Sequence, residues 1–393
     1  MKNKNKIIDL GMHPYADTFI NKNQLNKSEP VFPLQCYLDK SNCMIYNSVS
    51  TNEKDRYNLY EYSYTSSNSK LSKDYWANYG KSIIKQFKVN KSTKVLEIGS
   101  NDGYLLKQFK KKTKKILGVD ASIFMSKIAN NYNIKTSNLI FNKKNSIYLS
   151  RKYGNFDIVI ANNVLNHAND PFDFVKGVKN ILSKDGKFIF ELPYWYNLVK
   201  MKKFDQIYHE HVSYLTAKSS FNLLKNSNLE IFKIEETPYH GGSIRVFSKH
   251  ADVVNLNNAL DKIIKKEEKI KLFNTETYEE FMKILSLKKI KFLKKIIKYK
   301  SKGYKIVGIG AAAKANTFLN YIGLNNLIID FVTDASKYKI GKFTPLTRIP
   351  IYSDNALKTI GKKICAIPLA WNLSYILEKK LKKINKNIIF LRF

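Results

Sequence analysis

Two short segments concentrate side chains that exchange protons near neutral pH. One reads YHEH at residues 208–211, and the other ends the segment ANNVLNH at residues 161–167. Each follows an apolar run typical of a buried strand. An imidazole accepts a proton near neutral pH, an adjacent carboxylate fixes its tautomer, and a phenol can donate to a developing oxyanion. Such a set can remove a proton next to a carbonyl group, although the same residues could instead only cap and crosslink loops.

The segment VLEIGSNDGYLL at residues 95–106 has the pattern of a strand, a glycine-rich turn and a helix. Gly99 and Gly103 let the backbone approach a ligand where a side chain would collide. The acids Glu97 and Asp102 then lie at the carboxyl end of the strand, where open α/β sheets bind ligands. Carboxylates there suit the sulfonium amino acid S-adenosylmethionine (SAM) better than a pyrophosphate, which prefers bare amides at a helix N-terminus. The spacing also differs from the GxGxxG of dinucleotide sites.

An acid at the end of the next expected strand strengthens this interpretation. Asp120 follows the apolar residues 116–119, in a position where a carboxylate accepts hydrogen bonds from ribose hydroxyls. The alternative is a strand, turn and helix with incidental acids. We expect a SAM pocket made by Glu97, Gly99, Asn101, Asp102, Gly103, Asp120, Ala161 and Asn162.

Length and composition predict a soluble protein of two or three domains. The chain has 393 residues, of which 44% are hydrophobic and 25% charged. No apolar run reaches membrane-spanning length and the first residues lack a signal-peptide core, so we expect a cytoplasmic protein with no membrane partner. The three cysteines, Cys36, Cys43 and Cys365, form no obvious disulfide framework.

The formal net charge of +36 raises the question of a nucleic-acid partner. Only five of the 68 basic residues are Arg, the side chain best suited to bidentate phosphate and base contacts. The lysines are spread along the whole chain beside an excess of Asn and Ile, as a bias toward A/T-rich codons would produce. We therefore expect a generic solvated surface and no nucleic acid.

Alternating strand and helix patterns predict an α/β protein with two Rossmann-like units. We expect a small N-terminal domain at 1–75, a doubly wound domain of the class I SAM-methyltransferase type at 76–250, a helical connector at 251–302 and a C-terminal Rossmann-like domain at 303–393. Strands of the central domain are expected at 94–98, 115–119, 157–161, 187–191, 230–235 and 243–248.

The C-terminal unit has its own glycine-rich turn, GIGAAAKAN at residues 308–316. A relaxed dinucleotide fingerprint allows Ala313 as its third small residue, and Asp334 follows the next expected strand. Lys314 and Asn316 fall just inside the helix, where they could contact a phosphate or a sugar hydroxyl. The turn is thus a nucleotide pocket, a substrate-binding element or a scaffold only.

One absent motif narrows the reaction. Many amine and base methyltransferases carry an Asn/Asp-Pro-Pro-aromatic motif after the fourth strand, where this chain reads ANNVLNH. An imidazole base with phenol donors instead suits removal of a proton next to a carbonyl group. The resulting enolate carbon would attack the methyl group of SAM.

The motifs LEIGSNDGYLL, ANNVLNH, FDQIYHEHVSYL, TPYHGGSIRVF, VGIGAAAKANTFLNY, TDASKYKIGKFTP and IPLAWN follow one another in this order. Together they resemble the sugar C-methyltransferases that methylate C3 of dTDP-4-keto-deoxysugars, over nearly the whole chain. That family has an N-terminal zinc-binding domain, a central SAM domain and a C-terminal Rossmann-like domain.

The resemblance implies specific roles. His211 would be the base, with Glu210, Tyr208 and His167 around the sugar. A tyrosine of the segment YEYSYTSS would join them, with Tyr62 favoured over Tyr64. The loop HGGS-x-R would line the same cleft with His240, Gly241, Gly242, Ser243 and Arg245, beside Lys314 and Asn316.

The cysteines depart from the family pattern. The first cysteine pair is absent, and the second falls on Asp39 and Asn42, with Cys43 one place off. We therefore expect no zinc site of four cysteines and no other metal.

The whole pattern predicts a SAM-dependent C-methyltransferase of a nucleotide-linked keto-deoxysugar, serving a surface polysaccharide or another glycoconjugate, as a monomer or homodimer. The alternatives are an RNA or protein methyltransferase and an inactive paralogue that binds a sugar nucleotide.

Overall fold

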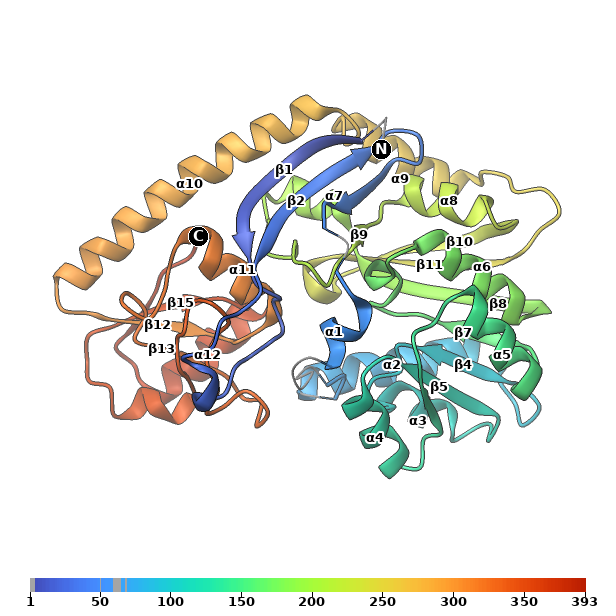
Figure 1. The fold of residues 1–393 in the computed structure, drawn as a ribbon, viewed down its shortest axis with the longest axis horizontal. Coiled ribbons are helices and arrows are strands. Elements are labelled where there is room, and N and C mark those ends of the chain that lie inside the picture. The colour runs from blue at the N-terminus through green and yellow to red at the C-terminus, as the bar shows by residue number, and fades with distance from the viewer. Residues whose placement is uncertain (1–3, 50, 59–64, 68) are drawn as a thin grey trace.

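The computed structural model describes residues 4–49, 51–58, 65–67 and 69–393, which form three sheets (Figure 1). The central sheet has the order β10-β11-β8-β7-β4-β5-β6. Strands β4 to β8 run parallel, whereas β11 lies antiparallel between β8 and β10. The strands are β4 Val95–Ile98, β5 Ile116–Asp120, β6 Thr136–Asn138, β7 Phe156–Ile160, β8 Leu182–Pro193, β10 Leu229–Thr237 and β11 Ser243–His250. The expected doubly wound α/β domain is therefore confirmed.

Helices cover this sheet, and several begin at residues that cap them. Ser69, Ser122, Asn142 and Asp170 each accept a hydrogen bond from a backbone amide of the first helical turn. The helices are α2 Lys70–Gln86, α3 Tyr104–Phe109, α4 Ile123–Asn131, α5 Lys143–Tyr153, α6 Pro171–Ile181, α7 Trp195–Lys200 and α8 Ala217–Lys225.

The C-terminal unit is a second parallel sheet, with the order β14-β13-β12-β15-β16. Its strands are β12 Lys305–Ile309, β13 Phe331–Thr333, β14 Ile351–Tyr352, β15 Ile364–Pro368 and β16 Ile388–Phe390, and its helices are α11 Ala313–Ile322 and α12 Ser374–Ile384. The expected second Rossmann-like domain is confirmed.

The connector consists of two helices, α9 Asn258–Lys269 and α10 Thr275–Ser301. In Figure 1, α10 runs along the outside of the molecule from the N-terminal strands to the C-terminal unit. Among the described residues, no helix is long and apolar enough to cross a membrane.

The N-terminal sheet contains a strand from the central part of the chain. Strands β1 Lys4–His13, β2 Phe32–Asp39 and β3 Met44–Asn47 are completed by β9 Ser213–Tyr214, which pairs with β3. Leu34, Leu38 and Ile45 are fully buried in its core. Since β9 begins two residues after His211, this sheet anchors one end of the YHEH segment.

Segments of the first 60 residues also contact both Rossmann-like units. In helix α1 Glu53–Asn58, Arg56 donates to the carbonyl oxygen of His167 at 3.1 Å in the central domain. Ile20 pairs with Phe343 of the C-terminal unit. The N-terminal region therefore connects the two units.

Candidate functional site

A cavity of about 640 Å³ lies between the central domain and the C-terminal unit. The carboxyl ends of β4, β5 and β7 face it from one side, and those of β12 and β13 from the other. Ten of the predicted site residues line it: Gly99, Asn101, Asp120, Asn162, His167, Tyr208, Glu210, His211, His240 and Lys314. Four of the eight predicted cofactor residues thus line the same cavity as the predicted proton-transfer residues on the YHEH and ANNVLNH segments.

Other predicted residues lie behind the cavity wall. They are Glu97, Asp102, Gly103, Ala161, Gly241, Gly242, Ser243, Arg245 and Asn316, and none of these side chains or glycines lines the cavity. Tyr62 and Tyr64 fall outside the described residues.

The first glycine-rich turn is held by the carboxylate of Asp120. The backbone amide of Asn101 donates to Oδ2 of Asp120 at 2.7 Å, and that of Ser122 donates to Oδ1 at 2.9 Å. Burial raises the pKa of Asp120 to about 6. Each carboxylate oxygen keeps a second lone pair, which can accept from a ligand hydroxyl at the cavity wall.

Gly99 allows the conformation of this turn and its close packing against Val164. Its φ is 70°, and a Cβ atom at this position would lie 2.8 Å from the side chain of Val164. A side chain would therefore be strained here and would also collide with its neighbour. The backbone forms the floor of the cavity at this point.

Glu97 lies below this floor with an incomplete set of partners. Its Oε2 is buried and has no hydrogen-bond partner among the described residues. Burial, reinforced by Asp102 and Asp120, raises its pKa well above the usual range. A positively charged ligand above the turn would favour the ionised form of Glu97. These carboxylates therefore fit the sulfonium and ammonium groups of SAM.

Two serines of the N-terminal region hold the same turn. The amide of Ser66 donates to Oδ1 of Asn101 at 2.8 Å, and the hydroxyl of Ser67 donates to Oδ2 of Asp102 at 2.6 Å. Sequence reasoning missed both residues, because a Ser pair in a polar segment carries no signal of its own. Asp102 therefore fixes the turn to the N-terminal region.

His211 and Tyr208 form a hydrogen-bonded pair at the cavity wall. His211 Nδ1 lies 2.9 Å from the carbonyl oxygen of Gln206, and its Nε2 lies 2.6 Å from the hydroxyl of Tyr208. A carbonyl only accepts, so Nδ1 carries the proton and Nε2 accepts from Tyr208. Burial lowers the pKa of His211 to about 3, which keeps the imidazole neutral.

His167 joins this pair from the neighbouring loop. Its ring centre lies 4.9 Å from that of His211, and its Nδ1 lies 2.9 Å from the hydroxyl of Tyr57. Burial lowers its pKa well below the usual range, assisted by His211 and Arg56. Tyr57, which also lines the cavity, was not predicted; its place just before the YEYSYTSS segment was the one available signal.

Glu210 is a buried carboxyl group with one partnered and one unpartnered oxygen. Its Oε1 accepts from the amide of Asp17 at 2.9 Å, whereas its Oε2 has no partner among the described residues. Burial raises its pKa to about 7. Near neutral pH the group can therefore donate a proton to, or accept a hydrogen bond from, a ligand in the cavity.

The loop HGGS-x-R shapes the wall from behind. Arg245 donates from Nε to Oε2 of Glu191 at 2.7 Å and stacks over the ring of Tyr79 at 4.3 Å. Ser243 donates to the carbonyl oxygen of Tyr239 at 3.0 Å. A Cβ atom at Gly241 would collide with the Trp371 ring, and one at Gly242 with the side chain of Asn197. These residues position His240, which lines the cavity.

The C-terminal unit contributes Lys314 and, behind the wall, Asn316. Lys314 lines the cavity and donates to Oδ1 of Asn372. Burial lowers its pKa to about 8. Asn316 donates to the carbonyl oxygen of Ala16 at 2.5 Å and so ties the C-terminal unit to the N-terminal region.

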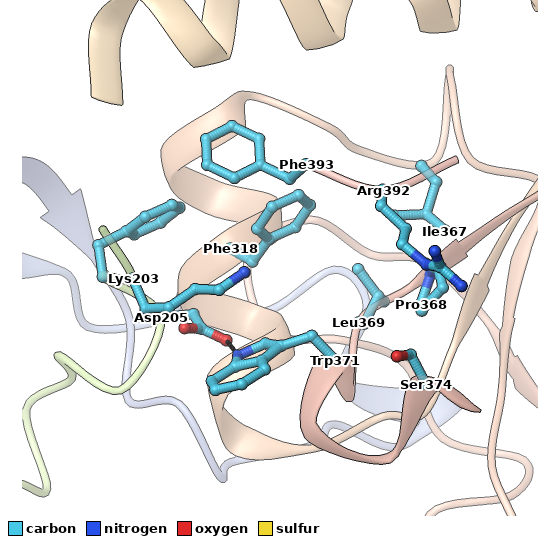
Figure 2. A pocket seen from close by; sticks show the side chains of 11 residues that line it. Lys203, Asp205, Phe318, Ile367, Pro368, Leu369, Trp371, Ser374, Arg392 and Phe393 are labelled. Carbon is cyan, nitrogen blue, oxygen red and sulfur yellow. Dashed lines mark hydrogen bonds between the residues drawn. The ribbon is translucent and has the colours of Figure 1, made fainter. Parts of the chain in front are cut away.

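A smaller cavity of about 240 Å³ is lined by Trp371 and its neighbours (Figure 2). The indole Nε1 donates to Oδ2 of Asp205 at 2.6 Å, and Lys203 lies over the ring at 4.7 Å. The residues on either side of Trp371 in the sequence, Ala370 and Asn372, line the large cavity.

The three cysteines are free, and Cys36 is fully buried in β2. In the part of the chain that the structure describes, no group of three or more His, Cys, Asp and Glu side chains could hold a metal ion.

Comparisons with known proteins match both units. The family described as "Methyltransferase domain" matches residues 74–234, and the family described as "C-methyltransferase C-terminal domain" matches residues 238–390. C-methyltransferase NovU of Streptomyces niveus is 28% identical over 260 residues, which are 66% of this chain and 62% of NovU. The chain thus aligns with about three fifths of that relative's length.

Two solved methyltransferase structures each cover a little under half of the chain. A SAM-dependent methyltransferase of Clostridium acetobutylicum is 16% identical, covering 45% of this chain and 92% of its own, with a TM-score of 0.36. Magnesium protoporphyrin IX methyltransferase of Synechocystis, solved with bound SAH, is 13% identical, covering 46% of this chain and 83% of its own, with a TM-score of 0.37.

Proposed function

We propose, from the two family models that the chain matches and from its likeness to NovU, that it transfers the methyl group of SAM to a sugar carbon next to a carbonyl group. The acceptor would be a nucleotide-linked keto-deoxysugar, methylated at C3 beside a 4-keto group. One observation carries the proposal: the glycine-rich turn at Gly99 and the proton-transfer residues around His211 line the same cavity.

SAM is the cofactor that fits the first turn, and when bound it supplies an electrophilic methyl group. Asp120 would accept from its ribose hydroxyls, and the buried Glu97 would stabilise its positive charge. Gly99, which lines the cavity, would contact it through its backbone. The rest of the chemistry then depends on making a nucleophilic carbon in the acceptor.

The pair of Tyr208 and His211 would remove the proton from that carbon. Because Nε2 of His211 already accepts from the Tyr208 hydroxyl, the proton reaches Nε2 through this hydroxyl. Gln206 holds the Nδ1 proton in place, so the imidazole presents its basic nitrogen to Tyr208. His167, held by Tyr57, lies against the same ring and fixes its orientation.

Glu210 would stabilise the negative charge that develops on the carbonyl oxygen. Its pKa of about 7 leaves much of the group protonated at neutral pH, and its unpartnered Oε2 can donate to an oxyanion. Burial of the whole cluster strengthens this hydrogen bond by excluding water.

The proposed product would be a branched sugar nucleotide made in the cytoplasm. Branched deoxysugars of this type suit a surface polysaccharide or another glycoconjugate. NovU of Streptomyces niveus, the relative described above, carries the name of a C-methyltransferase, which supports carbon as the methylated atom.

The test uses SAM with a ¹³C-labelled methyl group and a panel of nucleotide-linked 4-keto-deoxysugars. We expect a product heavier by one methylene group, with the label bonded to a carbon that has lost its proton. The Lys152→Ala variant, changed on the exposed end of α5, serves as a control that should keep full activity.

Label on oxygen or nitrogen would contradict carbon methylation. Label on RNA or protein, with none on any sugar, would show that the acceptor is a macromolecule and not a sugar.

A further inference from the structure

We propose that Thr317 and Trp371 of the C-terminal unit are positioning residues for the general base, acting through residues 205–207. The assignment rests on the proposed function, which makes His211 the base, and it adds how the C-terminal unit takes part in proton removal. Neither side chain is among the described residues that line the large cavity, so neither would touch the reacting atoms. Their effect would instead pass through the backbone of one short segment.

The tautomer of His211 depends on one backbone carbonyl. Its Nδ1 donates to the carbonyl oxygen of Gln206 at 2.9 Å, and this bond leaves Nε2 without a proton, so that it accepts from Tyr208. If the carbonyl moved away by about 1 Å, the distance from Nδ1 would exceed that of a hydrogen bond. The ring proton would then be free to lie on Nε2, where it would block the basic nitrogen.

The residues on either side of Gln206 are bonded to the C-terminal unit. Oδ2 of Asp205 accepts from the indole Nε1 of Trp371 at 2.6 Å (Figure 2). The carbonyl oxygen of Ile207 accepts from the hydroxyl of Thr317 at 3.0 Å. Thr317 lies in α11 and Trp371 follows β15, so the two bonds come from separate elements of that unit. Gln206 is thereby held from both sides.

Both bonds are buried, where water cannot easily replace them. Asp205 is 3% exposed, Thr317 is 2% exposed and Ile207 is fully buried. Oδ1 of Asp205 has no hydrogen-bond partner among the described residues. Loss of the Trp371 donor would therefore leave a buried carboxyl group short of hydrogen bonds, and the segment would have to shift to bring that group to water.

The other half of the loop is anchored by the N-terminal region. The side-chain amide of Asn47 donates to the carbonyl oxygens of Tyr208 at 2.8 Å and of His211 at 2.6 Å. This anchor keeps the His211 backbone in place when the bonds to the C-terminal unit are lost. A shift of residues 205–207 would then move the Gln206 carbonyl relative to the His211 ring.

The two bonds cross from the central domain to the C-terminal unit. Any separation of the two units that breaks them also weakens the hold on the Gln206 carbonyl. A third restraint comes from within the central domain, where the side-chain amide of Gln206 donates to the carbonyl oxygen of His240 at 2.7 Å. The base is therefore fully held only while the two units are docked.

Nitrogen NMR of the full chain, with ¹⁵N in its histidine rings, reads the His211 tautomer without any substrate. The spectrum of His211→Asn identifies the His211 signals, and the wild-type ring should carry its proton on Nδ1. Thr317→Val removes the hydroxyl and Trp371→Phe removes the indole donor. Each should convert part of the His211 population to the form protonated on Nε2. Thr317→Ser keeps a hydroxyl and should match the wild type.

Solvent deuterium exchange into a nucleotide-linked 4-keto-deoxysugar, without SAM, measures proton removal. We expect Trp371→Phe to slow this exchange up to about 100-fold and Thr317→Val about tenfold, because misplaced catalytic groups lose such factors. In Thr317→Val the loss should appear in kcat, with the sugar-nucleotide KM close to that of the wild type.

Thr344→Val is the matched control for lost stability. It removes a fully buried hydroxyl that is bonded to Thr347 within the C-terminal unit, away from residues 205–207. The His211 tautomer and the exchange rate should both stay as in the wild type.

An unchanged tautomer and an unchanged exchange rate in both Thr317→Val and Trp371→Phe would overturn the assignment. A loss in Thr317→Ser or Thr344→Val as large as that in Thr317→Val would also overturn it. If the wild type exchanges and methylates no sugar while the His211 tautomer still responds to Thr317→Val, the proposed function fails and the positioning role stands. Exchange that needs His211 but neither Thr317 nor Trp371 would do the reverse.

Discussion

The two glycine-rich turns share one backbone arrangement and differ in charge. Each ends a first strand, contains a glycine at positive φ, and is held by an acid at the end of the second strand, Asp120 in one and Asp334 in the other. The first turn adds Glu97 and Asp102, and the second adds Lys314. A shared framework thus offers one site suited to a cation and one suited to an anion.

The proposed proton-transfer residues come from neither turn. Tyr208, Glu210 and His211 lie on the loop that follows α7, and Tyr57 comes from the N-terminal region. The loop is anchored on one side by β9 in the N-terminal sheet. The comparison suggests that the two similar turns bind ligands, whereas proton transfer is assigned to loops of the central unit and to the N-terminal region.

The largest effect is expected from removing Asp120, the acid that holds the first turn. Asp120→Ala loses the ribose acceptor and the clamp on the Asn101 amide. Together these should weaken SAM binding about 100-fold, equivalent to about 2.7 kcal/mol. Calorimetry with SAM measures the loss, and Asp157→Ala, an exposed acid at the other end of the sheet, is the control. SAM binding within a few-fold of wild type would show that the first turn is not the cofactor site.

The two turns should also respond oppositely to pH. Burial raises the pKa of Asp120 to about 6, and its ionised form is the acceptor, so SAM affinity should fall as pH drops through 6. Burial lowers the pKa of Lys314 to about 8, and its charged form binds phosphate, so nucleotide affinity should fall as pH rises through 8. Below pH 6 the SAM affinity, and above pH 8 the nucleotide affinity, should each fall by up to about tenfold per pH unit.

Titrations at pH 5, 7 and 9 check both limbs. Asp120→Asn should flatten only the SAM limb, and Lys314→Met only the nucleotide limb. Parallel pH profiles for the two ligands would contradict the assignment of opposite charges.

A matched pair of glycine substitutions sharpens the comparison. Gly99→Ala and Gly310→Ala each place a Cβ atom 2.8 Å from a neighbouring side chain at positive φ. Each should lower the free energy of unfolding by about 1–3 kcal/mol. Gly99→Ala should in addition weaken SAM, and Gly310→Ala the nucleotide. Gly323→Ala, at positive φ with no contact within 4 Å, isolates the backbone strain. Equal ligand effects in both variants would remove the distinction between the turns.

The sequence predicted the units because their signals are local. The apolar runs of β4, β5 and β12 are each followed by a glycine-rich turn or an acid, so fold and cofactor turn can be inferred from consecutive residues. The YHEH segment was found in the same way. All of these follow from strand ends meeting at one edge of a sheet.

The remaining features depend on contacts between distant segments. Tyr57 and His167 are 110 positions apart, and Ser67 and Asp102 are 35 apart. Strand β9 has two residues and no periodicity of its own, and it forms because β3 offers a free edge. Arg245 was expected in the cleft, but its buried guanidinium pairs with Glu191 behind the wall. Such pairings depend on tertiary packing, which a single sequence does not encode locally.

Solvent exchange tests the central claim that Tyr208 and His211 make a carbanion. In deuterium oxide, without SAM, wild-type protein should exchange the proton on the carbon next to the carbonyl of a nucleotide 4-keto-deoxysugar. His211→Asn should slow this exchange about 10²–10⁴-fold, the usual contribution of a general base, while SAM and nucleotide affinities stay unchanged. Exchange by His211→Asn at the wild-type rate would contradict the account.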